Sequence, residues 1–575
     1  MKRSIAFVVL SAIAVTTAAP SARQRAAAAE LNAGVDKILA KWTASTPGCA
    51  VGVAIDGKPV LTKAYGLADL EHDVKNTPDT IFEAGSVSKQ FTAAAVLLLA
   101  REGKLSLDDP VRKYIPELPE YPPSPGTNGS GVGGQAAPLT IRHMLNHTSG
   151  LRDWGSVASI AGWPRTTRVH THAHVLEIVS HQRALNFPPG TRWSYSNTGF
   201  NLAAIIVSRV SGMSFADFTR TRIFEPLGMT HTSWRDDHTR VVKNRAIAYE
   251  DGRDGFHTEM PFETVHGNGG LLTTVGDLLT WNENFVTPRV GDASFVALQQ
   301  QVGKFRDGRA HEYAFGLYNR SYKGVRQVDH SGSTAGYRAD LARYPDQHLS
   351  VAVLCNASSG NATQAGHAVA DLYLGDRAKP PAPAAATYTL TSADLDRLAG
   401  LYRHTTTGVP LTIARNGDSL RVERGQADGL NPNAGQRLVA LSASRLVTAT
   451  RQTWEFDSRG GARMTDAFGT VDAYERVPPA KPTADQLKEV AGAYVSDEAE
   501  TTLTVALSGD SLMIKRRPDT TITLTPIYAD AFNAPQLGLV IFRRDAGRVT
   551  GLSVVQDRVW DLRFARQMSP MKSSQ

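Results

Sequence analysis

The sequence predicts an α/β (α+β) catalytic domain followed by two small all-β antiparallel barrels, and three observations lead to this fold class. Hairpin patterns and long apolar helical runs alternate over residues 30–378. A Pro- and Ala-rich stretch over 379–386 indicates a stiff linker at a domain boundary. Beyond it, short β-rich runs alternate with Gly and Asp turns, and the pattern occurs twice. At 575 residues the chain is also too long for a single hydrophobic core.

Residues 1–29 have the composition of a secretory signal peptide. A Lys-Arg pair precedes an apolar stretch over residues 5–15, and small residues then lead to a cleavage point expected between Ala19 and Ala29. A membrane anchor is the less favoured alternative because this stretch is short. Since no second apolar run is long enough to span a membrane, we expect a periplasmic or secreted protein with no stable membrane span after signal removal.

The region 30–378 mixes strands and helices. Its first hairpin is expected to turn at Asp56-Gly57, and a long apolar helix is expected to end at Gly103. The further expected elements are helices over 175–185 and 200–210 and a sheet return over 330–355 that turns at Pro345-Asp346.

A segment rich in Pro, Gly and Ser lies between residues 121 and 138. We expect a flexible surface loop there, because neither the lysine nor the helix of a phosphate-binding loop follows it. A role as a flap over the active site stays open.

A Ser-x-x-Lys sequence, Ser86 to Lys89, begins the long apolar helix, whose pattern is that of a buried helix. Residues three apart share one helix face, so the Lys89 amine can reach the Ser86 hydroxyl, a poor nucleophile until a base takes its proton. We expect burial to lower the pKa of Lys89 and the helix N-terminus to favour negative charge at Ser86. A Ser-x-x-Lys spacing also occurs by chance, so the neighbouring motifs must show whether it marks a catalytic site.

Two further motifs follow: Tyr195-Ser196-Asn197 and His330-Ser331-Gly332. In this order the three motifs resemble those of serine β-lactamases and penicillin-binding proteins. The Tyr-Ser-Asn form resembles the branch of class C β-lactamases, D-alanyl-D-alanine carboxypeptidases and D-aminopeptidases. The resemblance covers about residues 35–375, including the stretches 82–86, 102–110, 146–151, 182–190 and 269–274. It implies an antiparallel sheet flanked by helices, the β-lactamase/transpeptidase-like fold.

The resemblance also implies a role for each motif residue. Ser86 is the nucleophile that forms an acyl-enzyme. Lys89 and Tyr195 share the work of general base and general acid, and which of them takes the first proton stays open. The implied substrate-binding groups are Asn197, Gly332 and two oxyanion-hole donors, the backbone N–H groups of Ser86 and Ser333. The resemblance implies no metal and no organic cofactor.

His330 stands where β-lactamases of this branch usually have the lysine of Lys-Thr-Gly. A lysine keeps its charge at neutral pH and binds the carboxylate of a β-lactam, whereas histidine titrates near neutrality. Histidine at this position resembles some D-alanyl-D-alanine peptidases, D-aminopeptidases and esterases. A histidine that only bonds within the sheet is the alternative, and we favour His330 as a functional residue because of its place before the oxyanion donor.

These observations predict an exported serine hydrolase that acts on small peptides or amides containing D-amino acids, peptidoglycan fragments among them. Two alternatives use the same machinery: a short-chain carboxylesterase and a weak β-lactamase. An alternative of another class is a catalytically silent protein that binds cell-wall fragments. The presence of all the motif residues counts against it.

The chain beyond the linker repeats itself at an offset of 92 residues, with Gly400 and Tyr402 recurring as Gly492 and Tyr494. The copies are placed at 387–478 and 483–570, and each is expected to form a small barrel. They resemble the lipocalin-like C-terminal domains of bacterial D-aminopeptidases. Two roles stay open: restricting which substrates enter, or passive stabilisation.

The charge gives no reason to expect a nucleic-acid partner. The formal net charge is +7, but four basic residues and no acidic ones lie in the predicted signal peptide, which leaves about +3. No basic stripe interleaved with aromatic residues appears either.

Several histidines resemble the ligands of a metal site, and one further motif resembles that of an esterase family. His143, His147 and the run 170–174 lack the companion ligands of a zinc site, and we expect them to serve structure. The Gly-Asp-Ser-Leu sequence at 417–420 matches an esterase motif, but its recurrence at 509–512 favours a hairpin turn.

Two cysteines are few for an exported protein. The resemblance places Cys49 and Cys355 on antiparallel neighbouring strands, so a disulfide is geometrically conceivable. We expect instead two buried, small apolar side chains.

Overall fold

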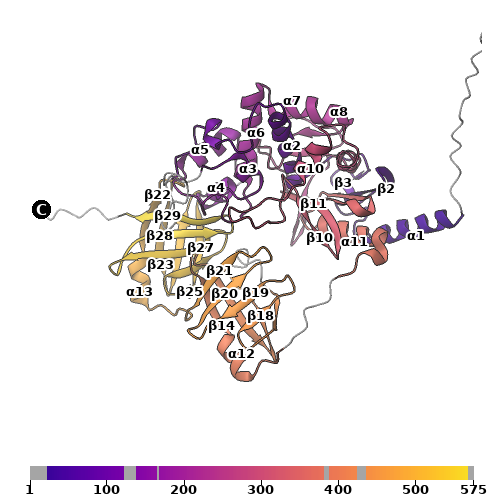
Figure 1. Ribbon diagram of the computed structural model, residues 1–575. Helices are drawn as coiled ribbons and strands as arrows, with labels where there is room; N and C mark the ends of the chain where they lie inside the picture. Colours follow the sequence, from indigo (N-terminus) through magenta and orange to yellow (C-terminus); the bar gives the residue numbers. More distant parts are fainter. Residues whose placement is uncertain (1–21, 122–137, 165–167, 381–387, 424–434, 568–575) are drawn as a thin grey trace, which may run out of the picture.

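The computed structural model describes residues 22–121, 138–164, 168–380, 388–423 and 435–567 (Figure 1). The predicted signal peptide falls mostly outside these ranges, and α1 begins at Ala22. The predicted loop at 121–138 and most of the linker lie outside them as well.

The catalytic domain is built on one six-stranded antiparallel sheet, as the sequence predicted. Its strands run in the order β10 (Tyr318–Tyr322), β11 (Val325–Thr334), β12 (Tyr337–Tyr344), β13 (Leu349–Cys355), β1 (Cys49–Ile55) and β2 (Lys58–Tyr65). Asp56 and Gly57 form the predicted turn between β1 and β2, both with positive φ (49° and 71°), as a tight two-residue hairpin requires. Strands β1 and β13 are far apart in the chain but pair side by side within the sheet.

Helices cover both faces of this sheet. Successive residues of β1 point to opposite sides, so they pack into two different cores. Val51 and Val53 pack with Val35 and Val369, which come from α1 (Ala22–Ile38) and α11 (Ala362–Leu374). On the opposite side, Ala50 and its neighbours belong to the large core formed by the helices between β2 and β10. These are α2 (Ser88–Arg101), α3 (Ile141–Leu145), α4 (Trp154–Ile160), α5 (His172–His181), α6 (Asn197–Ser211), α7 (Phe215–Thr219), α8 (Glu225–Leu227), α9 (Val275–Glu283) and α10 (Ala293–Gln299).

Short strands complete this domain. They are β3 (Leu67–Asp69) with β4 (Val74–Lys75), β5 (Phe82–Glu83) with β9 (Leu271–Thr273) and β6 (Ser233–Trp234), and β7 (Tyr249–Gly252) with β8 (Gly255–Thr258).

The helix expected over 175–185 is shifted in the structure. It begins at His172, where the Thr171 hydroxyl caps it and His174 bonds back to the Thr171 N–H. It ends at His181, where Gln182 leaves the helical conformation (φ −71°, ψ 111°). The Gln182 side-chain amide donates to the Ile178 carbonyl (3.2 Å) and to the Glu498 carbonyl of the second barrel (3.0 Å). A contact between domains therefore accompanies this boundary, and it left no periodic signal in the sequence.

The C-terminal part forms two closed eight-stranded antiparallel barrels, as predicted from the repeat. Barrel 1 follows α12 (Ser392–Leu398) and comprises β14 (Gly400–His404), β15 (Pro410–Asn416), β16 (Ser419–Val422), β17 (Arg437–Ala440), β18 (Arg445–Val447), β19 (Thr453–Phe456), β20 (Gly461–Thr465) and β21 (Val471–Arg476). Barrel 2 follows α13 (Ala484–Val490) and comprises β22 (Gly492–Ser496), β23 (Thr501–Ser508), β24 (Ser511–Arg516), β25 (Thr520–Tyr528), β26 (Ala531–Ala534), β27 (Gly538–Asp545), β28 (Arg548–Gln556) and β29 (Val559–Arg566).

The tyrosine that recurs in both copies of the repeat has a structural role. Tyr402 and Tyr494 are both buried, and each hydroxyl donates to the last turn of the preceding helix, at Leu398 (2.9 Å) and Val490 (2.7 Å). The same tyrosine thus fastens a short helix to its barrel in both copies.

Barrel 2 packs directly against the catalytic domain (Figure 1). Helix α4 lies between them: Trp154 belongs to the catalytic core, whereas Val157 and Ile160 join the core of barrel 2. The two barrels also touch each other, where the Tyr528 hydroxyl donates to the Gly408 carbonyl (2.5 Å). The three folded units therefore hold one another in place.

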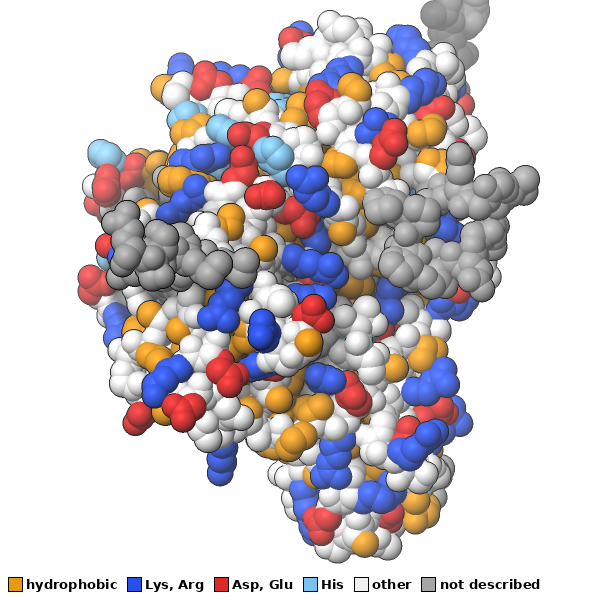
Figure 2. Space-filling model, turned by 90° about the vertical axis from the view of Figure 1, so that its left-hand side faces the viewer, with side chains coloured by type: hydrophobic (Ala, Val, Ile, Leu, Met, Phe, Trp, Pro, Cys, Tyr) orange, Lys and Arg blue, Asp and Glu red, His pale blue; other side chains and the backbone are white. Residues whose placement is uncertain are grey.

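Among the described residues, no single helix combines the length and apolarity needed to cross a membrane; α6 and residues Phe215–Leu227 meet that test only as a pair bent by 81°. On the face shown in Figure 2, basic and acidic side chains are interspersed.

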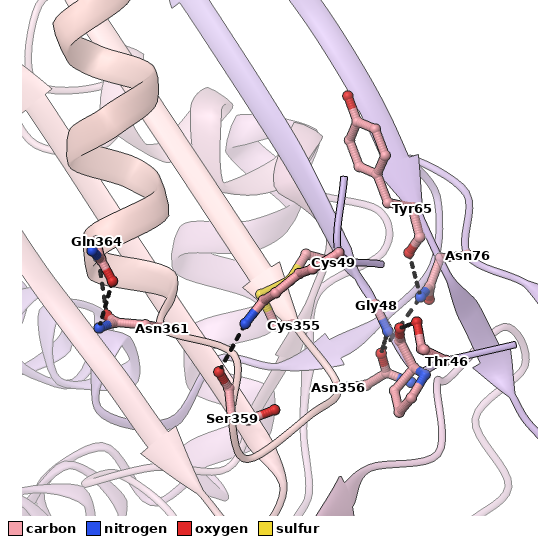
Figure 3. Close-up of a disulfide and its surroundings, with 12 residues drawn as sticks. Thr46, Gly48, Cys49, Tyr65, Asn76, Cys355, Asn356, Ser359, Asn361 and Gln364 are labelled. Atoms are coloured by element: carbon pink, nitrogen blue, oxygen red, sulfur yellow. Dashed lines mark hydrogen bonds between the residues drawn. A yellow bond between two sulfur atoms is a disulfide. The ribbon is translucent and has the colours of Figure 1, made fainter. Parts of the chain in front are cut away.

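Cys49 and Cys355 form a disulfide, so the expectation of two unpaired cysteines is wrong (Figure 3). The two residues are direct partners in the β1–β13 pairing, with a Cα–Cα distance of 4.0 Å. Antiparallel register places them opposite each other, and the sequence alone does not fix that register.

Replacing both cysteines with alanine is expected to lower the free energy of unfolding of the catalytic domain by about 2–4 kcal/mol, because the bond joins positions 306 residues apart. Urea denaturation of the two proteins measures this difference. Thiol titration of the denatured, unreduced wild-type protein should find no free sulfhydryl, and two titrating thiols would contradict the bond.

Candidate active site

Ser86 and Lys89 face each other at the start of α2. A 3₁₀ turn over Gly85–Val87 presents Ser86, and Lys89 lies in the first turn of α2 with its side chain fully buried. The Lys89 amine donates to Ser86 Oγ (3.0 Å). Its other acceptors are Asn197 Oδ1 (2.9 Å) and the Asn268 carbonyl (2.6 Å). The amine is thereby held against the hydroxyl, as the i, i+3 spacing predicted.

Asn268 was not identified from the sequence. Its backbone carbonyl holds the Lys89 amine, and its side chain accepts a hydrogen bond from Asn201 Nδ2 (2.7 Å) on α6. Asn201 in turn accepts from Trp154 Nε1 (2.8 Å). This buried chain of bonds orients Lys89 from behind. The only signal was the neighbouring Gly269-Gly270-Leu271 stretch, which does not point to the residue before it.

Tyr195 lies beside the nucleophile, and its hydroxyl shares a hydrogen bond with Ser86. Removal of water raises the pKa of Tyr195 above its ordinary value, while the bond to Ser86 and the nearby Arg558 oppose that rise. Two cations lie near its ring: Lys89 Nζ is 4.8 Å and the Arg558 guanidinium carbon 4.7 Å from the ring centre. Tyr195 is therefore a phenol at neutral pH, and the bond to Ser86 and the charge of Arg558 only partly offset the effect of burial on its pKa.

His330 is uncharged in this site. Burial, with the Lys89 charge nearby, lowers the pKa of His330 to about 3. Its Nδ1–H donates to the Ser331 carbonyl (2.6 Å), so Nε2 accepts from the Tyr313 hydroxyl (3.0 Å). Both ring nitrogens are thus engaged within the protein, and this wall of the site carries no positive charge at the position where related β-lactamases have a lysine.

The two predicted oxyanion donors lie at one place because β11 runs past the end of β10. The pairing of β10 with β11 stops at Asp329, so the stretch from His330 onward faces the turn before α2. The approach is very close: a Cβ on Gly332 would clash with the Ala84 carbonyl and lie 3.1 Å from Ser86 N. A Cβ on Gly85 would lie 2.7 Å from Ser333 N. Only glycine at these positions lets the two backbone N–H groups come together.

The site opens into a cavity of about 830 Å³ that is lined by Ser86, Tyr195, Asn197, His330, Gly332 and Ser333, all of the predicted site residues except the buried Lys89. Two lining residues come from barrel 2: Asp557 and Arg558, in the turn between β28 and β29. The sequence predicted a turn between two strands here but gave no sign of where it would dock. Barrel 2 therefore supplies part of the active-site wall.

Specific contacts fix this turn, which we name the β28–β29 turn (residues 557–558). The Arg558 carbonyl accepts from Asp153 N (3.3 Å) and from Asn186 Nδ2 (3.0 Å). Asp153 also accepts from Asn197 N through its carboxylate (2.7 Å). Nearby, Arg152 forms an ion pair with Glu498 of barrel 2 (2.5 Å), with both side chains almost removed from water. The turn is thus bonded to the residues that orient Asn197.

Three of the other histidines singled out in the sequence bond to the backbone of neighbouring segments, while the buried His147 accepts from Ser196 N (3.2 Å) and packs its ring against Tyr195. His143 and His174 each accept a hydrogen bond from the N-terminal residue of a helix, at Thr140 (3.2 Å) and Thr171 (3.0 Å). His172 Nε2 bonds the His266 carbonyl (2.9 Å).

Comparison with known proteins agrees with this geometry. The family model described as "Beta-lactamase" matches residues 26–375, more than half of the chain. A D-aminopeptidase of Gluconobacter oxydans (strain 621H) is 28% identical over 561 residues, covering 94% of this chain and 99% of the relative. A D-aminopeptidase of Brucella anthropi (strain ATCC 49188) is 26% identical over 527 residues, covering 88% and 93%. Penicillin-binding protein 4* of Bacillus subtilis (strain 168) is 28% identical over 326 residues, covering 53% and 67%.

Among solved structures, the octameric penicillin-binding protein homologue from Pyrococcus abyssi has the same fold. It aligns with a TM-score of 0.52 at 24% identity and covers 78% of this chain and 99% of its own. The site geometry and the family match lead to one conclusion: the chain belongs to the beta-lactamase family and is a serine hydrolase.

Proposed function

We propose that this enzyme releases N-terminal D-amino acids from small peptides and amides. The observation that carries the proposal is the β28–β29 turn, which brings Asp557 to the cavity of the nucleophile. Its carboxylate lies 3.7 Å from Arg558 Nε, and its side chain is 65% exposed. A free α-ammonium group on a substrate is the natural partner of a carboxylate. The relatives that this chain matches nearly end to end, across both barrels, are D-aminopeptidases.

The residues support a two-step acyl transfer. Ser86 Oγ attacks the substrate carbonyl carbon while its proton passes to the Lys89–Tyr195 pair. The oxyanion accepts hydrogen bonds from the N–H groups of Ser86 and Ser333. The C–N bond then breaks, the leaving amine takes the proton from the same pair, and water hydrolyses the Ser86 ester in the reverse sequence.

Asn197 binds the acyl side of the substrate in this scheme. Its Oδ1 accepts from Lys89 (2.9 Å), so its amide is held in one orientation with the NH₂ group as the remaining donor. That donor suits a carbonyl of the substrate.

The neutral His330 favours this function over β-lactam hydrolysis, although Arg338 and Arg558 also line the cavity. A β-lactam carboxylate would meet an imidazole whose nitrogens are already bonded to Ser331 and Tyr313. A substrate that has a free amine and no carboxylate next to His330 does not need a positive charge at this position.

Changing Asp557 to Asn is expected to raise KM for D-alaninamide by about tenfold or more, because a charge-assisted hydrogen bond contributes roughly 1.5–3 kcal/mol. The variant should change kcat/KM little for an ester without an amine, such as p-nitrophenyl butyrate. Steady-state kinetics on both substrates measures this contrast. An equal loss on both would mean that Asp557 shapes the site rather than binding the amine.

The function itself is tested with three substrates: D-alanine p-nitroanilide, its L-enantiomer and p-nitrophenyl butyrate, with Ser86→Ala as the blank. We expect cleavage of the D-anilide well above that of the L-anilide, lost in the variant. Cleavage of the ester alone would make the enzyme a carboxylesterase and overturn the proposal. Binding without turnover of any substrate would favour a silent binding protein.

We also propose that the enzyme is exported and meets peptidoglycan peptides, which contain D-amino acids. Support comes from residues 1–29, whose composition is that of a signal peptide. Mass spectrometry of the N-terminus of the protein recovered from the periplasm or medium tests export, and a full-length cytoplasmic product would contradict it.

A further inference from the structure

A second cavity of about 310 Å³ lies where barrel 1, barrel 2 and the catalytic domain meet. This volume is at the lower end of the range for small-molecule sites. Trp193, Tyr195 and Asp557 line both this cavity and the active-site cavity. The two spaces therefore adjoin at the residue that shares a hydrogen bond with the nucleophile. We name the smaller one the barrel 1 cavity.

Apart from Asp557, to which the proposed function assigns the substrate ammonium group, the charged groups in the wall of this cavity are bonded to other protein groups. Asp472 binds Arg192, and its carboxylate also accepts from His404 Nε2 (3.1 Å). His404 is neutral, since burial lowers its pKa to about 4, and its Nδ1 accepts from Thr406 N and Thr407 N (both 3.1 Å). Asp466, for its part, accepts from the N–H groups of residues 468 and 470. Little of this polarity is left for a ligand.

The rest of the wall is apolar and aromatic. Leu411 and Met464 belong to the core of barrel 1 and reach the cavity from inside the barrel. Phe468 and Trp560 line it from the β20–β21 turn and from barrel 2. A surface of this kind favours an apolar or aromatic side chain.

The walls are fixed before any substrate arrives. Arg309 of the catalytic domain donates to the Phe468 carbonyl (3.1 Å), which ties the β20–β21 turn to that domain. On another side, the Arg192 guanidinium lies 5.7 Å from the centre of the Trp560 ring. Preformed walls bind a side chain without the cost of ordering them.

The position of Tyr195 decides which part of a substrate reaches this cavity. When the C–N bond breaks, the leaving nitrogen takes its proton from the Lys89–Tyr195 pair, and of these two only Tyr195 lines the barrel 1 cavity. This orientation leaves the acyl group the larger cavity, which Ser331 and Ser333 of β11 line. The leaving part of the substrate therefore points toward the barrel 1 cavity.

We propose that the barrel 1 cavity is the subsite for the residue that follows the cleaved bond, and that it selects a bulky apolar or aromatic side chain there. The proposal rests on the proposed function and gives barrel 1 a role in substrate choice. Thr407 and Thr470 are both partly exposed in the cavity wall, so larger side chains at these positions would reduce the volume of the barrel 1 cavity.

The test compares D-alanyl-L-phenylalanine, D-alanyl-glycine and D-alaninamide on the full-length enzyme. Wild type should show kcat/KM about tenfold or more higher for the phenylalanine dipeptide than for the glycine dipeptide. Thr470→Trp and Thr407→Trp, which fill the cavity, should lower kcat/KM for the phenylalanine dipeptide by about tenfold and leave D-alaninamide, whose leaving group is ammonia, within about twofold. The matched control is Thr405→Trp, at an exposed position outside the cavity, and it should change none of these values.

Equal rates on the two dipeptides in wild type would overturn the subsite while leaving the D-aminopeptidase function intact. An equal loss on all three substrates in both filling variants would also overturn it. If the enzyme cleaves no D-alanyl substrate and only esters, the proposed function fails, and benzyl butyrate against methyl butyrate replaces the dipeptides. A preference for the benzyl ester that Thr470→Trp removes would keep the subsite, and no preference would overturn it too.

Discussion

Replacing Lys89 with methionine is expected to lower kcat/KM by about 10,000-fold or more on every acyl substrate, the scale seen when an enzyme loses a residue that acts as a unit with its nucleophile. Methionine has similar length, but it can neither hold the Ser86 hydroxyl nor take part in its proton transfer. It also leaves Asn197 Oδ1 and the Asn268 carbonyl without the amine that now binds both. The KM value should change far less than kcat, because Lys89 contacts the reacting hydroxyl and is itself buried away from the cavity.

The matched control is Lys104→Met, just beyond the same helix. Lys104 is exposed and pairs with a surface carboxylate, Glu102 (2.9 Å), so its loss should leave kcat within about twofold. Thermal unfolding of both variants shows whether the domain is still folded. A folded Lys89→Met enzyme that retained a tenth of wild-type activity would contradict the role of Lys89.

Replacing Gly332 with alanine is expected to lower kcat by about 100-fold to 1,000-fold, the effect of losing one oxyanion-hole donor. The new methyl group would clash with the Ala84 carbonyl, so β11 must move away from the turn that carries Ser86. Because Ser333 N–H lies on the moved segment, the two donors separate. Stopped-flow or steady-state kinetics on D-alaninamide measures kcat directly.

Gly276→Ala is the control for this substitution. Gly276 lies in α9, and the nearest atom to an added Cβ is the Thr274 hydroxyl at 3.8 Å, which is ordinary contact. Its activity should equal that of wild type. A Gly332→Ala enzyme with normal kcat would show that the oxyanion is stabilised elsewhere.

The sequence predicted those parts of the site that are local or that carry a family motif. The distance between Ser86 and Lys89 follows from helix geometry, so three residues of spacing were enough to predict their contact. Tyr195, Asn197 and His330 were found only because their motifs resemble a known family. The paired barrels followed from a repeat of constant offset.

Contacts between distant segments could not be predicted in the same way. The Cys49–Cys355 bond depends on strand register across 306 residues, and the expectation that it was absent was wrong. Asp557 and Arg558 form an ordinary hairpin turn by sequence, and only the docking of barrel 2 on α4 brings them to the nucleophile. Asn268 acts mainly through its backbone carbonyl, which has no sequence signature.

The most direct test of the account is to trap the acyl-enzyme. Full-length enzyme is mixed with a fluorophosphonate probe, or with excess D-alanine methyl ester and quenched in acid, and its intact mass and peptide map are recorded. We expect one adduct, located on Ser86 and missing from Ser86→Ala, together with loss of activity in step with labelling. An adduct on another residue, or full activity in a completely labelled enzyme, would contradict it.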